Sequence, residues 1–180
     1  MDNLMDIVKG RRSIRRYEEK EISEGDLQKI LESVQWAPSW ANSQCWEIIV
    51  IKDPAIKAEL QEKSVPKNAA TKAIVEAPIV LAICGKKNIA GCYKGEAVTK
   101  FGDWMMFDLG IASQNICLVA HSLGLGTVIV GMFDHDQAAK TLKVGQDYEV
   151  VVLIPVGYPA KDSQAPKRRE INEFVHNDTF

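Results

Sequence analysis

Apolar residues recur at helical spacing in the N-terminal part of the chain. The apolar positions within residues 4–8 predict a short helix that ends at Gly10. A second helix is predicted to begin at Ser23, which has capping-box spacing to Asp26, and to end before Pro38. The segment between these two helices carries a cluster of arginines, so that cluster is expected in connecting chain.

Beyond Pro38, apolar runs of strand length alternate with helical patterns. Strands are predicted at 47–51, 79–84, 127–130 and 149–156, and helices at 54–63, in a segment that ends near residue 77, and at 134–142. This alternation indicates an α/β-like sheet covered by helices. Residues 85–100 show no clear period, and the pattern stops after Gly157.

The most apolar segment, residues 101–122, predicts a helix about 33 Å long that is apolar on most sides. Such a helix has to be covered on more than one face. A length of 180 residues predicts one domain, 1–180, and covering the helix is easier if a second subunit helps. The helix also carries three polar residues that require partners inside the protein, namely Asp108, Gln114 and Asn115.

The residues after Gly157 offer few apolar anchors. Ile171, Phe174 and Val175 are the candidates in this stretch. We expect this tail either to stay loose or to wrap around a partner.

Charge and composition narrow the classes of function. With 22 basic and 24 acidic side chains the net charge is -2, which gives no electrostatic reason to expect nucleic acid or an anionic membrane as a partner. No stretch has the roughly 18 apolar residues of a membrane span, and the N-terminus lacks a secretory signal. The four cysteines form no C-x-x-C pair, and the three histidines lack metal-ligand spacing. We therefore expect a soluble, cytoplasmic protein without a metal site.

Basic side chains cluster at both ends of the chain. Residues 11–16 place four guanidinium groups and a hydroxyl together, and Lys167-Arg168-Arg169 forms a second cluster. Charge-assisted donors that converge from separate segments can neutralise a phosphate. Alternatively, such residues form a solvated surface with a few ion pairs, or contact nucleic acid.

The segment from Ala37 to Trp46 is a turn rich in amide and hydroxyl groups. Fixed donors and acceptors of this kind suit a heteroaromatic ring with imide and carbonyl edges, such as a flavin. The alternative is an ordinary helix-to-strand turn in which Ser39, Asn42 and Ser43 cap backbone groups and both tryptophans are core. Gly124-Leu125-Gly126 precedes a strand and lacks a third glycine, so it predicts a helix cap and not a dinucleotide fingerprint.

The motifs occur in a characteristic order: R-R-S-I-R, A-P-S-x-x-N-x-Q-x-W, a long apolar helix, G-L-G-T-V-I-V-G and P-K-R-R. This order resembles the nitroreductase-type FMN oxidoreductases over nearly the whole chain. The resemblance implies an α+β fold of three α/β/α layers, with a mixed central sheet flanked by helices, a long buried central helix and an extended C-terminal tail. It also implies an obligate homodimer with two FMN sites at its interface.

The resemblance implies which residues contact FMN. Arg11 and Ser13 match the N-terminal contacts at the phosphate, and Lys167 and Arg169 match the C-terminal ones. Arg15 lies towards the ribityl chain and the pyrimidine side, where a cation stabilises the reduced anionic ring and tunes its potential. The full set of implied cofactor contacts is Arg11, Arg12, Ser13, Arg15, Pro38, Ser39, Asn42, Val130, Gly131, Lys167 and Arg169.

The resemblance also implies where two groups of these residues lie relative to the flavin. Pro38, Ser39 and Asn42 resemble the turn that reaches the flavin bound mainly by the opposite subunit. Gly131, with the backbone beside it at Val130, resembles the segment near flavin N5. No side chain need act as acid, base or nucleophile, because the chemistry belongs to the cofactor.

The sequence also departs from the family pattern. Cys45 stands where proline is common before the tryptophan, and Val130 stands where larger bacterial relatives have glutamate. Asn68 and Lys72 align only loosely with the family's mid-chain flavin contacts. Residues 85–100 are short where larger relatives insert helices over the flavin, so the acceptor is left open.

The expected function is oxidation of NAD(P)H and reduction of a small electron-poor acceptor, such as a nitroaromatic or a quinone. One open flavin face used in turn by both substrates predicts ping-pong kinetics. Two alternatives stay open. One is a flavin-dependent dehalogenase or flavin-consuming relative of the same fold, and the other is a non-catalytic dimer that binds flavin or another anion.

Overall fold

The computed structural model describes residues 3–180. At its centre lies a four-stranded sheet in the order β1-β2-β6-β5, formed by β1 (Trp46–Ile51), β2 (Ile79–Lys86), β6 (Tyr148–Gly157) and β5 (Gly126–Thr127). Neighbouring strands of this sheet are antiparallel. A mixed sheet was expected, but among the described residues parallel pairing is limited to an isolated bridge between Ser13 and Thr127.

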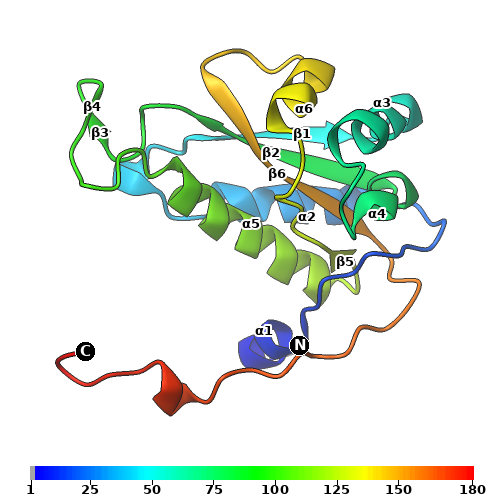
Figure 1. Cartoon of the computed structure of the whole chain (residues 1–180). Coiled ribbons are helices and arrows are strands. Elements are labelled where there is room, and N and C mark those ends of the chain that lie inside the picture. The colour runs from blue at the N-terminus through cyan, green and yellow to red at the C-terminus, as the bar shows by residue number, and fades with distance from the viewer. Residues whose placement is uncertain (1–2) are drawn as a thin grey trace.

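Helices cover both faces of the sheet (Figure 1). On one face lie α2 (Glu24–Gln35) and α5 (Met105–Ser122), and on the other lie α3 (Pro54–Glu59), α4 (Thr71–Glu76) and α6 (His135–Leu142). Successive side chains of a strand point to opposite faces, and β2 accordingly supplies both cores. Ile79, Leu81 and Ile83 pack towards α2 and α5, whereas Val80, Ala82 and Cys84 pack towards α3, α4 and α6. The predicted three-layer arrangement is confirmed.

Side-chain caps fix several of the predicted helix starts. Ser23 Oγ accepts a hydrogen bond from the Asp26 amide at 3.1 Å, and Asp53 caps α3 in front of Pro54. The predicted helix at 54–63 divides into α3 and a π-helical turn, η2 (Leu60–Ser64). The short helix α1 (Leu4–Gly10) lies apart from the sheet and packs on α5. Within residues 3–180, no helix is both long and apolar enough to cross a membrane.

The segment without a clear period forms a hairpin and an irregular loop before α5. Strands β3 (Cys92–Tyr93) and β4 (Glu96–Ala97) are joined through Lys94 and Gly95, both with positive φ (50° and 83°), as a two-residue hairpin turn requires. Trp104 stands at the N-cap of α5 and donates from Nε1 to Thr99 Oγ1 at 2.7 Å. The long helix therefore begins at residue 105, and not at residue 101 as the apolar pattern suggested.

The C-terminal tail runs away from the sheet after β6 ends. In Figure 1 it leaves the body near β5, passes α1 and ends far from the strands. Residues 160–180 are exposed, including Ile171, Phe174 and Val175, and the short helix η3 (Ile171–Glu173) is the one regular element described there. The apolar anchors expected from the sequence thus have no core to pack against within the described chain.

Candidate functional site

Residues 11–17, here called the arginine segment, are attached to the edge of the sheet by backbone hydrogen bonds. The Ile14 amide donates to Thr127 O at 2.9 Å, and the Ala160 amide donates to Arg16 O at 3.0 Å. Tyr17 is buried, and its hydroxyl lies 2.8 Å from the carbonyl oxygen of Ile14, to which it donates. The segment is thereby held between β5 and the start of the tail.

The arginines of this segment have different surroundings. Arg12 donates from Nη1 to the carbonyl oxygens of Lys9, Gly10 and Arg11, so its guanidinium caps the C-terminal end of α1. The Nε atom of Arg16 lies 2.9 Å from Glu76 Oε2 on α4.

Within residues 3–180, neither Arg11 nor Arg15 forms an ion pair. Neighbours in an extended segment point to opposite sides, so Ser13 and Arg15 face away from the buried Ile14. Arg11, Ser13 and Arg15 therefore keep polar groups available for a ligand.

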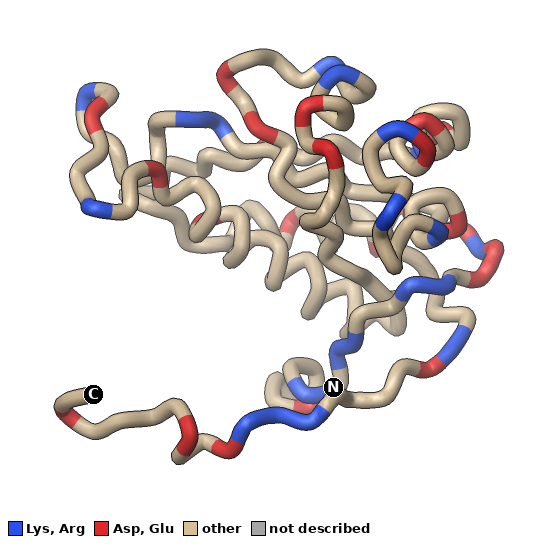
Figure 2. The backbone as a smooth tube through the Cα atoms, in the orientation of Figure 1, with Lys and Arg blue, Asp and Glu red and all other residues tan. Residues whose placement is uncertain are grey.

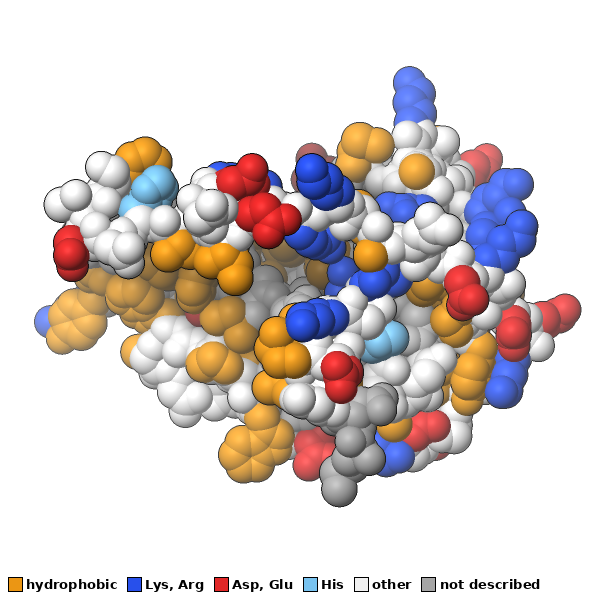
Figure 3. Space-filling view, turned by 90° about the horizontal axis from the view of Figure 1, so that it is seen from below, with side chains coloured by type: hydrophobic (Ala, Val, Ile, Leu, Met, Phe, Trp, Pro, Cys, Tyr) orange, Lys and Arg blue, Asp and Glu red, His pale blue; other side chains and the backbone are white. Residues whose placement is uncertain are grey.

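A cavity of about 290 Å³ adjoins the arginine segment and the beginning of the tail. Figure 3 shows Lys and Arg side chains gathered around a hollow on this face, with a histidine beside them. The residues from both ends of the chain and from the end of α5 that line the cavity are Gly10, Arg11, Arg12, Ile14, His121, Gly124, Leu125, Gly126, Thr127, Pro159, Asp162 and Ser163. The N-terminal basic cluster and the tail thus meet at one place.

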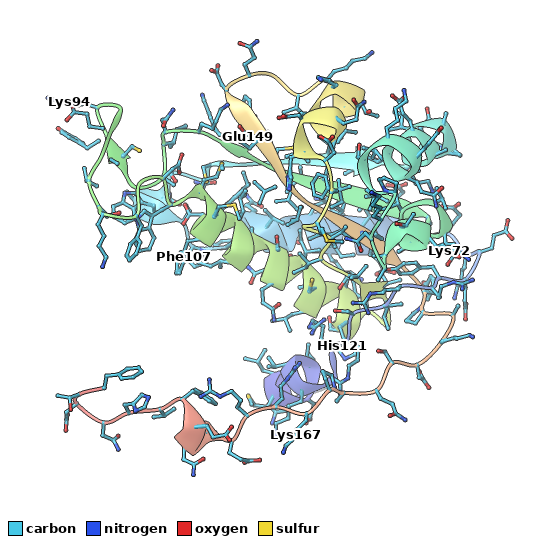
Figure 4. All side chains as sticks on the ribbon, in the orientation of Figure 1. Lys72, Lys94, Phe107, His121, Glu149 and Lys167 are labelled. Carbon is cyan, nitrogen blue, oxygen red and sulfur yellow. The ribbon has the colours of Figure 1, made fainter. Side chains whose placement is uncertain are left out.

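The C-terminal basic residues lie on the same side of the molecule. Figure 2 shows the basic stretch of the tail passing α1, and Figure 4 places Lys167 beside that helix. Lys167 and Arg169 are both exposed. Arg169 is paired within the tail, with Nε 3.8 Å from Glu173 Oε2. In this orientation the basic stretch of the tail lies on the side of the molecule that carries α1, but Lys167 and Arg169 are not among the residues that line the cavity.

The candidate site residues in the middle of the chain lie near the sheet edge that also holds the arginine segment. Val130 is buried and exchanges backbone hydrogen bonds of 2.9 and 3.0 Å with Leu153, which leaves Gly131 exposed. Asn68 donates from Nδ2 to Met132 O at 2.9 Å and so holds the chain beside Gly131. Lys72 is exposed on α4, one turn before the glutamate that binds Arg16 (Figure 4). Asn68 therefore contacts the chain beside Gly131 from the loop before α4, and Lys72 lies on the helix that contacts Arg16.

Residues 38–46, here called the turn segment, lie elsewhere. Trp40 packs on Trp104 at the start of α5, with ring centroids 5.1 Å apart, whereas α1 contacts the end of α5, where His121 lies against Gly10. At 1.5 Å per residue, the thirteen helical steps between Asp108 and His121 span about 20 Å. Within one protomer, Pro38, Ser39 and Asn42 are therefore not brought together with Arg11 and Ser13.

The sequence profile described as the Nitroreductase family matches residues 8–158 of this chain. The chain belongs to the nitroreductase family. The predicted family and the predicted enzyme class are confirmed at this level.

Similar proteins support the nitroreductase assignment along the whole chain. A Methanothermobacter thermautotrophicus protein provisionally named NADH dehydrogenase/NAD(P)H nitroreductase is 30% identical over 164 residues, covering 89% of this chain and 79% of that protein. The FMN reductase (NAD(P)H) of Bacillus subtilis is 28% identical over 192 residues, covering 100% of this chain and 75% of that protein. The solved FMN-dependent nitroreductase of Clostridium difficile R20291 has a TM-score of 0.82 at 27% identity, covering 98% and 99% of the two chains.

One residue that contacts the turn segment of this nitroreductase-family protein was not among the predicted site residues. Asp108 on α5 is 2% exposed, and its two carboxylate oxygens accept from the Trp40 amide at 3.1 and 3.0 Å. Cys45 Sγ lies 3.7 Å from the same carboxylate, and burial, followed by the nearby Asp108 charge, raises the pKa of that thiol to about 11. The signal in the sequence was an acidic residue within an apolar helix.

His135 and His176 do not line the cavity, and each contacts an aromatic ring. His135 Nδ1 lies 2.7 Å from Val150 O and its ring stacks on Phe133, and His176 stacks on Phe180 in the tail. In the part of the chain that the structure describes, no group of three or more His, Cys, Asp or Glu residues could hold a metal ion.

Proposed function

We propose that this nitroreductase-family protein is an FMN-dependent homodimer that oxidises NAD(P)H and reduces a small electron-poor acceptor, such as a nitroaromatic or a quinone. The observation that carries the proposal is the meeting of the arginine segment with the start of the tail at one cavity, in a chain of this family. The names of the similar proteins support both the nicotinamide substrate and the flavin.

The donor set fits a flavin mononucleotide. A phosphate monoester is best held by several charge-assisted donors, and Arg11, Ser13, Lys167 and Arg169 supply guanidinium, hydroxyl and ammonium groups on one side of the molecule. In this assignment Arg15 carries positive charge to the pyrimidine side of the ring. Arg12 caps α1 through Nη1, while its buried Nε has no partner within residues 3–180 and its side chain lines the cavity, so the guanidinium keeps a donor for the phosphate.

When bound, FMN supplies the hydride chemistry, accepting from NAD(P)H and donating to the acceptor. The exposed backbone at Gly131, which Asn68 fixes through the Met132 carbonyl, would lie beside the reactive edge of the ring. No second nucleotide-binding motif is needed, because both substrates use the same open face in turn. This arrangement supports ping-pong kinetics.

The exposed side of α5 supports the homodimer. Met106 and Phe107 are 62% and 60% exposed, and with Gly110 and Ile111 they line an apolar depression on that helix. Exposed apolar patches of this kind mark interaction surfaces. A second copy seated there would cover the helix and bring its own turn segment to the cofactor that the first copy holds.

An anaerobic absorption titration tests the function. Purified protein with FMN should lose the oxidised flavin band at about 450 nm when NADH or NADPH is added, and a nitroaromatic or a quinone should restore it. A protein that takes up no FMN would overturn the proposal. A flavin that is never bleached would favour the non-catalytic binding dimer, and FMN that is destroyed during turnover would favour a flavin-consuming relative.

A further inference from the structure

Asp108 occupies an unusual position in the long central helix. Among residues 3–180 it is the only buried acidic side chain, and none of the ion pairs within that range includes it. A carboxylate taken out of water is costly unless hydrogen bonds compensate it. Here the compensation comes from the turn segment, through the Trp40 amide and the Cys45 thiol.

The turn segment has a backbone that its own sequence does not favour. Ala41, Asn42 and Gln44 have φ angles of 46°, 55° and 47°, in the left-handed region that glycine prefers. Such conformations persist where the surroundings over-determine them, and they cluster at ligand-binding sites. Within the turn, the Gln44 amide donates to Ser39 Oγ at 3.0 Å. Further internal bonds run from the Asn42 amide to Ser39 O and from the Ser43 amide to Trp40 O, but these bonds do not attach the turn to the rest of the protein.

That attachment is made at the start of α5. Asp108 accepts from the backbone of Trp40, and Trp104, four residues earlier and thus on the same side of the helix, packs on the Trp40 ring. One residue of the turn is therefore held by both its backbone and its side chain. The contacts fix Trp40 immediately before the strained residues at 41 and 42.

We propose that Asp108 is a positioning residue that holds the turn segment in the shape needed to contact the cofactor. The inference rests on the proposed function, because the cofactor contacts are those of Ser39 and Asn42. Asp108 itself touches no ligand. In this arrangement the central helix determines the geometry of a loop that acts on the flavin held by the other subunit.

The first test is a titration of FMN into wild-type protein and Asp108→Asn. Asparagine keeps the size of the side chain but has one acceptor oxygen, so the two-oxygen contact with Trp40 is lost. The dissociation constant should rise about tenfold. Lys57→Met is the matched control, because Lys57 is also a buried charged residue with a backbone partner, Ala77 O at 2.8 Å, and it lies away from the turn. This control should lower the melting temperature and leave FMN affinity unchanged.

A double-mutant cycle separates positioning from general stability. If Asp108 acts through the turn, Asn42→Ala should weaken FMN binding in the wild-type background and have little further effect with Asp108→Asn present. Additive losses, or a wild-type dissociation constant for Asp108→Asn, would overturn the inference while the proposed function stands. Wild-type protein that takes up no FMN would remove both.

Hydrogen exchange gives a readout that needs no variant to fold. The Trp40 amide should exchange slowly in the wild-type protein without FMN, because it is bonded to Asp108, whereas the amide of the exposed residue Ala41 should exchange quickly. Equal, fast exchange at both amides would contradict the proposed attachment.

Discussion

The arginine segment and the turn segment are held in place by different means. The arginine segment is bonded through its backbone to Thr127 and to the start of the tail, so its position depends on the edge of the sheet. The turn segment is bonded through Trp40 to one carboxylate 68 residues away in the sequence. The first segment is supported by backbone pairing, whereas the beginning of the second is supported by the side chains of Asp108 and Trp104, and backbone pairing holds only its end, where the Lys86 amide donates to Cys45 O at 2.8 Å.

This difference has a consequence for how each segment responds to substitution. Backbone pairing does not depend on which polar side chain stands at Arg11, Ser13 or Arg15, so those residues can be replaced without moving the segment. The shape of the turn segment depends on Asp108, so a substitution there changes geometry as well as chemistry. Substitutions in the arginine segment should therefore change ligand affinity without changing stability. Substitutions in the turn segment should change both.

The largest effect is expected from Arg11→Ala. Loss of a charge-assisted bond to phosphate should raise the FMN dissociation constant about 100-fold, as measured by quenching of flavin fluorescence. The free energy of unfolding without FMN should change little, because the backbone of Arg11 still caps α1 by donating to Ile7 O at 3.0 Å.

Arg16→Ala is the matched control, since it removes the same charge from the same segment. Arg16 is half exposed and paired with Glu76, and exposed pairs of this kind contribute little. Its dissociation constant for FMN should stay within about twofold of wild type. Equal losses in the two variants would mean that only the net charge of the segment matters, and would remove the specific role given to Arg11.

A charge placed on the exposed side of α5 tests whether the turn segment acts across a dimer. Phe107→Glu should leave a species with the 20.0 kDa mass of one chain in light scattering, where wild type gives twice that value. FMN affinity should fall about tenfold or more as the second copy is lost. Lys140→Glu, an exposed position on α6 in the opposite layer, should remain dimeric. A monomeric variant with wild-type FMN affinity would contradict the two-copy site.

Much of the fold could be predicted because the order of apolar and polar residues within a segment indicates which of its faces is buried. The apolar runs at 47–51, 79–84 and 149–156 lie within β1, β2 and β6, whose faces repeat every two residues. The two-residue strand β5 was over-predicted as 127–130, because Val130 meets β6 only as an isolated bridge. The short length of β5 is therefore determined by the strand beside it and not by its own apolar pattern.

The site was predictable where composition carries the chemistry and unpredictable where distant residues decide it. Four arginines in 11–16 indicate an anion site, but the sequence does not distinguish Arg12, which caps α1, from Arg11. In three dimensions the helix end binds Arg12 and Glu76 binds Arg16, which distinguishes both from Arg11. The role of Asp108 was equally unpredictable, because the tertiary fold determines which residue of the turn segment lies beside its carboxylate.

Tyr17→Phe should weaken the attachment of the arginine segment without removing any ligand contact. The buried hydroxyl lies 2.8 Å from Ile14 O and 3.1 Å from Pro155 O, and the substitution would remove the single proton that it donates between these two carbonyl oxygens. The free energy of unfolding should fall by about 1–2 kcal/mol in urea titrations, with a smaller effect on FMN affinity than Arg11→Ala has. Tyr158→Phe serves as control, because the ring that Lys20 contacts is retained. No loss in Tyr17→Phe would mean that the sheet edge holds the segment without this residue.

The smallest effect is expected from alkaline pH acting on the turn segment. The pKa of Cys45 is raised from 9.0 to about 11 by burial and by Asp108, so the folded protein keeps the thiol proton that the unfolded chain loses. Its contribution to stability is complete below pH 9.0 and declines as pH rises towards about 11. At pH 9.5 the decline should be about 1 kcal/mol or less, measured as a lower urea midpoint. Cys45→Ala should be less stable at neutral pH but should show a shallower decline, and an unchanged slope would place the alkaline sensitivity outside the turn segment.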